Sequence, residues 1–204
     1  MGVERLSAAL VTHDQSDHAG GLADVLGSMP VARVALAMPA PELEALAASR
    51  SVGVVRVAEG SELRSGDLRL SVLWPPRDRL AVAAGGDPGV EDPNAESLVL
   101  LAEWGHFSML LPGDAESELA PLEPGPVDVL KVAHHGSADE GLASLLRTSV
   151  PRLAVISSGR ENPYGHPAPE TLDDLAAGGV AAVRTDLDGD VLIEADASGW
   201  RVLD

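Results

Sequence analysis

The sequence predicts an α/β fold, a layered sheet structure with some antiparallel strands in its middle and at its end. Short apolar runs alternate with segments of helical period along the 204 residues, as in strand and helix units packed in layers. Two apolar runs around Gly105 and several short runs in the tail indicate the antiparallel strands. We expect one domain over residues 1–204, because this length suits a single core.

The first half of the chain opens with the apolar run 6–12 (LSAALVT), which predicts a buried strand ending at a loop of histidines and aspartates. Residues 20–29 (GGLADVLGSM) predict a helix whose first turn faces that loop. The next expected elements are a strand at 31–37, a helix at 40–50 and strands at 52–58 and 68–74. Residues 75–96 are rich in Pro, Gly, Asp and Ala, which predicts a long irregular loop.

The second half begins with 97–111, which predicts two strands around a turn at Gly105 with His106 in solvent. The elements expected after it are a strand at 127–133, a helix at 140–149, a strand at 152–158 and a helix at 168–178. The tail from residue 180 predicts two or three short strands, with Asp188–Gly189 as a hairpin turn.

Composition narrows the classes of function. The formal charge is -18 and Lys131 is the only lysine, which argues against nucleic-acid binding by the free surface, although bound divalent ions would change the field at an active site. We expect Lys131 to be a surface residue at a strand end. There is no cysteine, so a metal site would use His, Asp, Asn or Gln. No run approaches the ~20 apolar residues of a membrane span and no signal pattern is present, so a free-standing chain would be cytoplasmic.

Polar clusters follow the predicted strands at four places: His13, Asp14, Gln15, Asp17 and His18; then Asp114; then His134 and His135; and finally His166. Because ligands in open α/β sheets collect beyond the carboxyl ends of strands, we expect these clusters to meet. Imidazoles and carboxylates bind Zn²⁺, Mn²⁺ or Fe²⁺ where no thiolate is available. Asp114 could bridge two ions, and such a pair supports phosphoryl displacement.

Spacing within the first cluster directs His13 and Gln15 towards one ion, and Asp17 with His18 towards another. Ordinary structural roles are the alternatives. Ser16 or Asp17 could cap a helix, Asp114 and His166 could occupy plain turns, and one of the two adjacent histidines could be structural.

The motifs, taken in order, resemble a known family. Residues 13–21 (HDQSDHAGG) are close to the His-x-His-x-Asp-His signature of the metallo-β-lactamase fold. Residues 94–116 (NAESLVLLAEWGHFSMLLPGDAE), 127–137 (VDVLKVAHHGS) and 155–175 (VISSGRENPYGHPAPETLDDL) are similar to the C-terminal hydrolase-like domain of ComEC-type competence proteins, the DNA-uptake channels of bacterial transformation.

The resemblance implies an αββα sandwich, one or two divalent ions (Zn or Mn), and a hydrolase acting on a phosphodiester such as DNA. The implied metal ligands are His13, Gln15, Asp17, His18, Asp114, His134, His135 and His166. The expected catalytic residues are Asp17, His134 and His135, one of the two adjacent histidines serving as the acid for the leaving group. Asn94, Ser97 and His166 are expected at the substrate, or Asn94 and Ser97 shape the loop.

The chain departs from the family pattern in two respects. Gln15 stands where relatives carry His or Asp, so the first ion should bind more weakly. The chain also starts one strand before the first motif, which predicts a domain shortened by its first strands, or one cut from a channel protein and facing the extracytoplasmic side of the membrane.

Three functional hypotheses follow from these features. The first is a metal-dependent nuclease in competence-type DNA uptake, and the second is a catalytically weak or inactive metal-binding module of a larger channel. The third is a hydrolase of the same fold acting on a lactam, thioester or lactone, from which the HHGS and YGHP segments point away.

Overall fold

The computed structural model describes residues 3–84, 92–120, 122–196 and 198–203. Over these residues the strands form a three-stranded sheet in the order β1-β2-β3, a seven-stranded sheet in the order β10-β9-β8-β7-β6-β5-β4, and a hairpin of β11 and β12. The three-stranded sheet is parallel, and the seven-stranded sheet is antiparallel from β4 to β7 and parallel from β7 to β10.

The strands are β1 (Ala9–Leu10), β2 (Arg33–Leu36), β3 (Gly53–Arg56), β4 (Glu62–Ser65), β5 (Leu68–Trp74), β6 (Val99–Trp104), β7 (Phe107–Leu111), β8 (Val129–Lys131), β9 (Leu153–Ile156), β10 (Ala181–Arg184), β11 (Leu192–Asp196) and β12 (Gly199–Leu203). The α-helices are α1 (Ser16–Ala19), α2 (Leu22–Ser28), α3 (Pro41–Ser49), α4 (Arg77–Ala84), α5 (Leu142–Ser149), α6 (Pro169–Ala177) and α7 (Thr185–Asp188). Two 3₁₀ turns, η1 (Pro93–Glu96) and η2 (Ala133–Gly136), complete the described elements.

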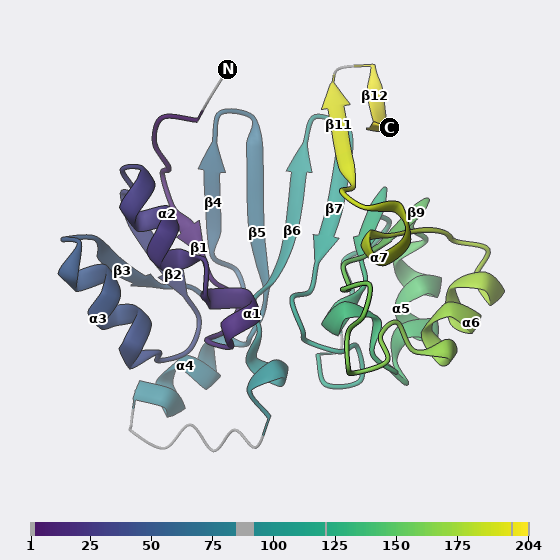
Figure 1. Cartoon of the computed structure of the whole chain (residues 1–204), viewed down its shortest axis with the longest axis horizontal. Helices are drawn as coiled ribbons and strands as arrows, with labels where there is room; N and C mark the ends of the chain where they lie inside the picture. The colour runs from purple at the N-terminus through teal and green to yellow at the C-terminus, as the bar shows by residue number, and fades with distance from the viewer. Residues whose placement is uncertain (1–2, 85–91, 121, 197, 204) are drawn as a thin grey trace.

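The molecule has four layers, two sheets between two layers of helices, and an apolar cluster lies between each pair of neighbouring layers (Figure 1). One cluster packs α2 and α3 on the small sheet, and another packs α5 and α6 on the large sheet. The third lies between the sheets and includes Ala35 and Leu100. Leu100 belongs to the cluster between the sheets, whereas Val99 belongs to the cluster under α5 and α6, so these neighbouring residues of β6 point to opposite faces of the sheet. The predicted αββα sandwich is therefore confirmed.

The β11–β12 hairpin covers the end of the large sheet above β7, β8 and β9. Trp200 packs near Phe107, with ring centroids 6.1 Å apart, and its indole Nε1 donates to Asp128 Oδ1 at 3.0 Å. The indole is thus buried on one side and hydrogen-bonded at its polar edge. Among the described residues, none of the helices combines the length and the apolar character needed to cross a membrane.

Several sequence predictions are corrected by the structure. The run 6–12 pairs as a strand only at Ala9–Leu10, with a separate bridge from Leu6 to Val31. The segment Ser16–Ala19, expected in a loop, forms a helical turn. The strand Glu62–Ser65 was not expected, because it is a mostly exposed edge strand without an apolar alternation.

Two larger errors lie in loops. The segment 75–96, expected to be an irregular loop, contains α4 and η1. The prediction missed α4 because the Gly and Pro residues later in the segment outweighed the helix-forming residues directly after Pro76. Residues 85–91 lie outside the described residues. Asp188–Gly189 is not a hairpin turn. Gly189, with φ +79, ends the helical turn α7, and the antiparallel pair is instead β11 with β12.

Candidate metal centre

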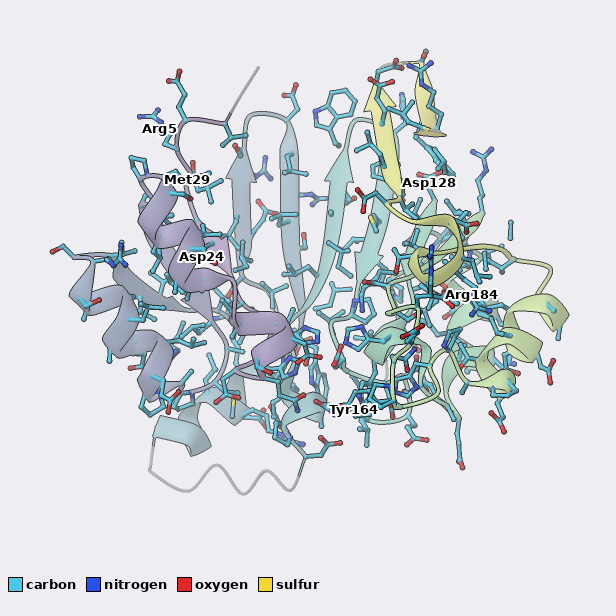
Figure 2. The ribbon with its side chains drawn as sticks, viewed as in Figure 1. Arg5, Asp24, Met29, Asp128, Tyr164 and Arg184 are labelled. Carbon is cyan, nitrogen blue, oxygen red and sulfur yellow. The ribbon has the colours of Figure 1, made fainter. Side chains whose placement is uncertain are left out.

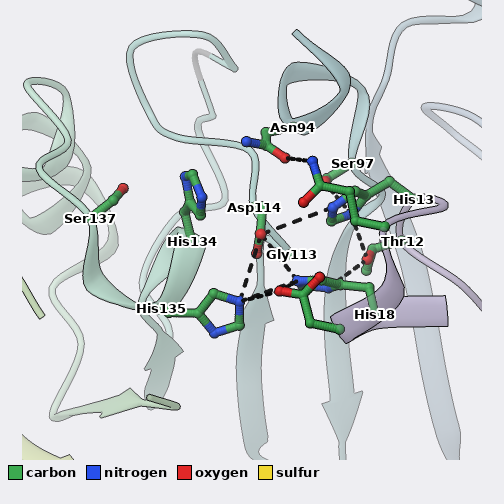
Figure 3. A network of polar contacts seen from close by, with 12 residues as sticks. Thr12, His13, His18, Asn94, Ser97, Gly113, Asp114, His134, His135 and Ser137 are labelled. Carbon is green, nitrogen blue, oxygen red and sulfur yellow. Dashed lines mark hydrogen bonds and ion pairs between the residues drawn. The ribbon is translucent and has the colours of Figure 1, made fainter. Parts of the chain in front are cut away.

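The loops after β1, β7 and β8 bring the main candidate ligands together at one end of the sandwich (Figure 3). A backbone hydrogen bond from Leu98 N to Thr12 O, 3.0 Å long, joins the loop after β1 to the start of β6. A second one, from His134 N to Gly113 O at 3.2 Å, joins the loops after β7 and β8. The site is therefore built where the two sheets meet.

The HHG segment of η2 has an unusual backbone. His134 and His135 have φ angles of 44° and 54°, and Gly136 follows with φ +85, so three consecutive residues are left-handed. Such a conformation costs free energy for residues other than glycine and concentrates at functional sites. A Cβ on Gly136 would lie 2.7 Å from Pro167 Cβ, so the segment also requires glycine for space.

Four side chains form a group with metal-binding geometry: Asp17, His18, Asp114 and His135 each offer a ligand atom, and these atoms all lie within 4.8 Å of one another. His18 Nε2 lies 3.0 Å from Asp114 Oδ2 and 3.3 Å from His135 Nε2. Asp17 Oδ2 lies 3.4 Å from His135 Nε2 and 3.7 Å from His18 Nε2. This set is called the four-residue group below.

The Nδ1 atoms of three histidines of the site, His13, His18 and His135, each have a polar partner. Thr12 Oγ1 lies 3.1 Å from Nδ1 of both His13 and His18, and the carbonyl oxygen of Ser157 lies 2.8 Å from Nδ1 of His135. A partner at Nδ1 fixes the ring orientation and, where Nδ1 donates, leaves an unprotonated Nε2 lone pair for a metal. Sequence reasoning missed Thr12 and Ser157, since a hydroxyl and a carbonyl carry no motif of their own.

Asp114 carries the clearest indication of a cation. Its side chain is 1% exposed, and neither carboxylate oxygen receives a hydrogen bond of good geometry from the described residues, despite the 3.0 Å approach of His18. His13 Nε2, 4.0 Å from Asp114 Oδ2, is likewise buried without a partner among those residues. A buried carboxylate is costly unless it is paired or coordinates a metal, so these donors fit a divalent ion.

Electrostatics of the site favour ligands in their metal-binding forms. Burial alone would raise the pKa of Asp114, but the contact with His18 and the positive charges of His18 and Lys131 outweigh it and lower the pKa. Burial lowers the pKa of His13, and the neighbouring His18 lowers it further. An ionised Asp114 and a neutral His13 are both ready to bind a metal.

Gln15 is part of a separate hydrogen-bonded pair. Its amide nitrogen donates to Asn94 Oδ1 at 2.8 Å. The nearby Gln15 side chain acts to raise the pKa of His13, but burial and His18 outweigh it and lower that pKa. Ser97 Oγ lies 2.9 Å from His13 Nδ1 and is fully buried. Asn94 therefore contacts Gln15, and Ser97 contacts His13. Because Ser97 is fully buried, it is better placed to orient the His13 ring than to contact a substrate.

His134 differs from His135 in its partners. His134 Nδ1 lies 2.8 Å from Glu116 Oε1, which also accepts a hydrogen bond from the Ser137 hydroxyl. The hydrogen bond with Glu116 raises the pKa of His134 against the effect of burial, and the contact with His134 lowers the pKa of Glu116. Glu116 was not recognised from the sequence, although it follows Asp114 by two residues. The pair resembles an oriented acid rather than a metal ligand.

His166 lies beside His134, with ring centroids 5.6 Å apart, and outside the four-residue group. Its pKa is lowered by burial and by the nearby His134 and His135. His106 is exposed in the turn between β6 and β7, as predicted.

The expectation that Lys131 is a surface residue was wrong. Lys131 ends β8 and turns its ammonium group inward, where Nζ donates to the carbonyl oxygens of Gly113 (3.3 Å) and Val132 (3.2 Å). Burial lowers its pKa, while Asp114 and Asp17 act in the opposite direction. The last residue of β8 faces the Gly113 loop rather than solvent, because that loop covers this end of the sheet.

Comparisons with known proteins agree with the motifs. The chain is 33% identical over 202 residues to ComE operon protein 3 of Bacillus subtilis, covering 93% of this chain and 25% of the relative. It is 30% identical over 194 residues to Recombination protein 2 of Haemophilus influenzae, covering 92% and 22%. The chain thus spans about a quarter of the length of the curated relatives it matches. No family model matches the chain.

Solved structures show the same fold at low sequence identity. CmlA, a diiron β-hydroxylase from Streptomyces venezuelae, matches with a TM-score of 0.61 and 18% identity, over 99% of this chain and 45% of that one. The metallo-β-lactamase fold protein YhfI from Bacillus subtilis matches with a TM-score of 0.54 and 9% identity, over 88% and 74%. The chain has the metallo-β-lactamase fold and resembles the ComEC-type competence proteins over nearly its whole length.

Proposed function

We propose that this chain is a metal-dependent phosphodiesterase that cleaves DNA, and that it acts as a domain of a competence-type uptake protein. The observation that carries the proposal is the four-residue group, in which the carboxylate of the buried Asp114 lies 3.0 Å from His18 Nε2 and receives no hydrogen bond of good geometry from the described residues. The names of the relatives, which include a competence protein of Neisseria gonorrhoeae, support DNA as the substrate. In a channel protein the domain would lie at the extracytoplasmic face of the membrane.

In this proposal Asp17, His18, Asp114 and His135 hold the first divalent ion, Zn²⁺ or Mn²⁺, and His13 with Gln15 contributes to a weaker second position. A bound ion would supply a Lewis acid and lower the pKa of a water molecule. His134, oriented by Glu116 at 2.8 Å, would keep a proton for the departing oxygen of the phosphodiester. His166 beside it would face the substrate, or add a ligand when the metal is bound.

The proposal is tested by adding Mn²⁺ or Zn²⁺ to the purified chain and measuring hydrolysis of methyl 4-nitrophenyl phosphate and of single-stranded DNA. We expect metal-dependent cleavage of both that a chelator abolishes. Metal binding without cleavage of either substrate would instead support the second candidate, a non-catalytic metal-binding module. The neutral amide at Gln15, hydrogen-bonded to Asn94, is the observation that favours this second candidate.

Gln15→Asp should strengthen the weaker metal position. A carboxylate near His13 adds a negative ligand, so affinity for the second ion should rise on the order of 10-fold. Calorimetric titration with Mn²⁺, together with elemental analysis of the dialysed protein, would measure this change. Gln15→Ala is the matched control, which removes the amide without adding charge. Equal stoichiometry and affinity in both variants would show that residue 15 does not face a metal.

A further inference from the structure

Tyr164 has no role in the site described so far. It is the only tyrosine of the chain and is 78% exposed. It lies in the loop between β9 and α6, at the lower end of the molecule in Figure 2, opposite the β11–β12 hairpin. Tyrosine carries a large flat apolar ring, and such rings are often exposed where they bind a partner.

The Tyr164 ring connects to the site through a series of rings. It stacks on His166 with an interplanar angle of 15° and a centroid distance of 6.0 Å. His166 in turn lies 5.6 Å from His134, the residue that we assign to the departing oxygen. The Tyr164 ring therefore lies beside the His166 imidazole and nearly parallel to it, and His166 separates it from His134.

Hydrogen bonds within the loop hold this position without burying the ring. The Asn162 side chain accepts from His166 N at 2.9 Å and donates to His166 O at 2.7 Å and Gly159 O at 2.8 Å. Gly165, between Tyr164 and His166, has φ +76, a conformation that glycine adopts readily. The loop is thus fixed around an outward-facing aromatic ring, as expected of a preorganised binding surface.

A nucleobase fits this surface. Bases stack on aromatic side chains irrespective of their sequence, and both faces of a base inside a duplex are already covered by its neighbours. A ring that takes a base beside the reacting phosphate therefore selects an unpaired base. We propose that Tyr164, beside His166, is a stacking platform for an unpaired base next to the phosphodiester that is cleaved; this inference rests on the proposed function.

The test compares two substrates with the metal-loaded chain: an oligothymidylate, and an oligomer of equal length built from abasic residues. The ratio of their kcat/KM values measures the contribution of the base. In Tyr164→Ala this ratio should fall about 5- to 20-fold, because one stacking contact is lost. Tyr164→Phe keeps the ring and should keep the ratio. Leu192→Ala, which shortens another exposed apolar side chain on β11, is the matched surface control.

The outcomes separate the two proposals. A ratio unchanged in Tyr164→Ala, or changed equally in Leu192→Ala, overturns the stacking platform while leaving phosphodiester cleavage intact. An equal fall in Tyr164→Phe would assign the effect to the hydroxyl group and also overturn it. A wild-type chain that cleaves no phosphodiester overturns the proposed function, and the stacking platform with it.

Discussion

Replacing Asp114 by asparagine should abolish hydrolysis and weaken metal binding by more than about 100-fold. The carboxylate is 1% exposed and lies within 4.0 Å of a ring nitrogen of His13, His18 and His135, so no other side chain can take its place. At 100 times the Kd, a bound ion stabilises the wild type by about 2.7 kcal/mol, which raises its Tm by roughly 5–10 °C. The variant should lose this shift.

The metal-free protein provides an internal check on the same substitution. Without an ion, the contact with His18 and the charges of His18 and Lys131 lower the pKa of Asp114, so the ionised carboxylate stabilises the folded state above that pKa, and asparagine removes this contribution. The Tm of metal-free Asp114→Asn should therefore be at or below that of metal-free wild type, and the metal-induced shift is measured for each protein against its own metal-free form. Asp14→Asn, an exposed change in the first ligand loop, is the matched control and should keep the metal-induced shift. A full shift in Asp114→Asn would contradict the assignment of the metal centre.

Substitution of His134 and substitution of His135 should have different effects on metal binding and catalysis. His135→Asn removes a member of the four-residue group and should weaken metal binding by at least about 10-fold. His134→Asn should leave metal affinity nearly unchanged and lower kcat by about 10² to 10⁴-fold, because it removes the group paired with Glu116. Asparagine suits both variants because it tolerates the left-handed backbone of η2.

Calorimetry with Mn²⁺ and single-turnover cleavage would measure the two effects separately. His106→Asn, in the exposed β6–β7 turn, is the matched control for a histidine-to-asparagine change. A loss of metal affinity in His134→Asn as large as that in His135→Asn would show that both imidazoles are ligands, and the division of roles would be wrong.

The sequence predicted the central elements of the fold because their apolar periods are strong. The paired strands around Gly105 and the helix at 169–177 bury apolar faces, and a buried face leaves a clear pattern. The polar edge strand Glu62–Ser65 and the helix after Pro76 were missed, since neither carries a pronounced apolar face. The Asp188–Gly189 signal failed because Gly189 ends a helical turn just as readily as it makes a hairpin.

The candidate site was predictable in its residue types, because four polar clusters follow strands that end on the same side of the fold. The separate roles of these residues within the site were not predictable. The pairing of His134 with Glu116 and of Gln15 with Asn94 depends on side-chain directions set by tertiary packing. The inward turn of Lys131 likewise depends on a loop that covers the end of β8. Sequence spacing carries no information about such contacts.

The origin of the ligands along the chain has a consequence for biosynthesis. His18 lies in the helical turn α1 after β1, and His135 lies in the 3₁₀ turn η2 after β8. Their Nε2 atoms therefore approach to 3.3 Å only when residues 117 positions apart have been brought together. A growing polypeptide that carries only the first motif has no complete centre. A complete metal centre would therefore form only after most of the domain has been translated and both sheets have docked.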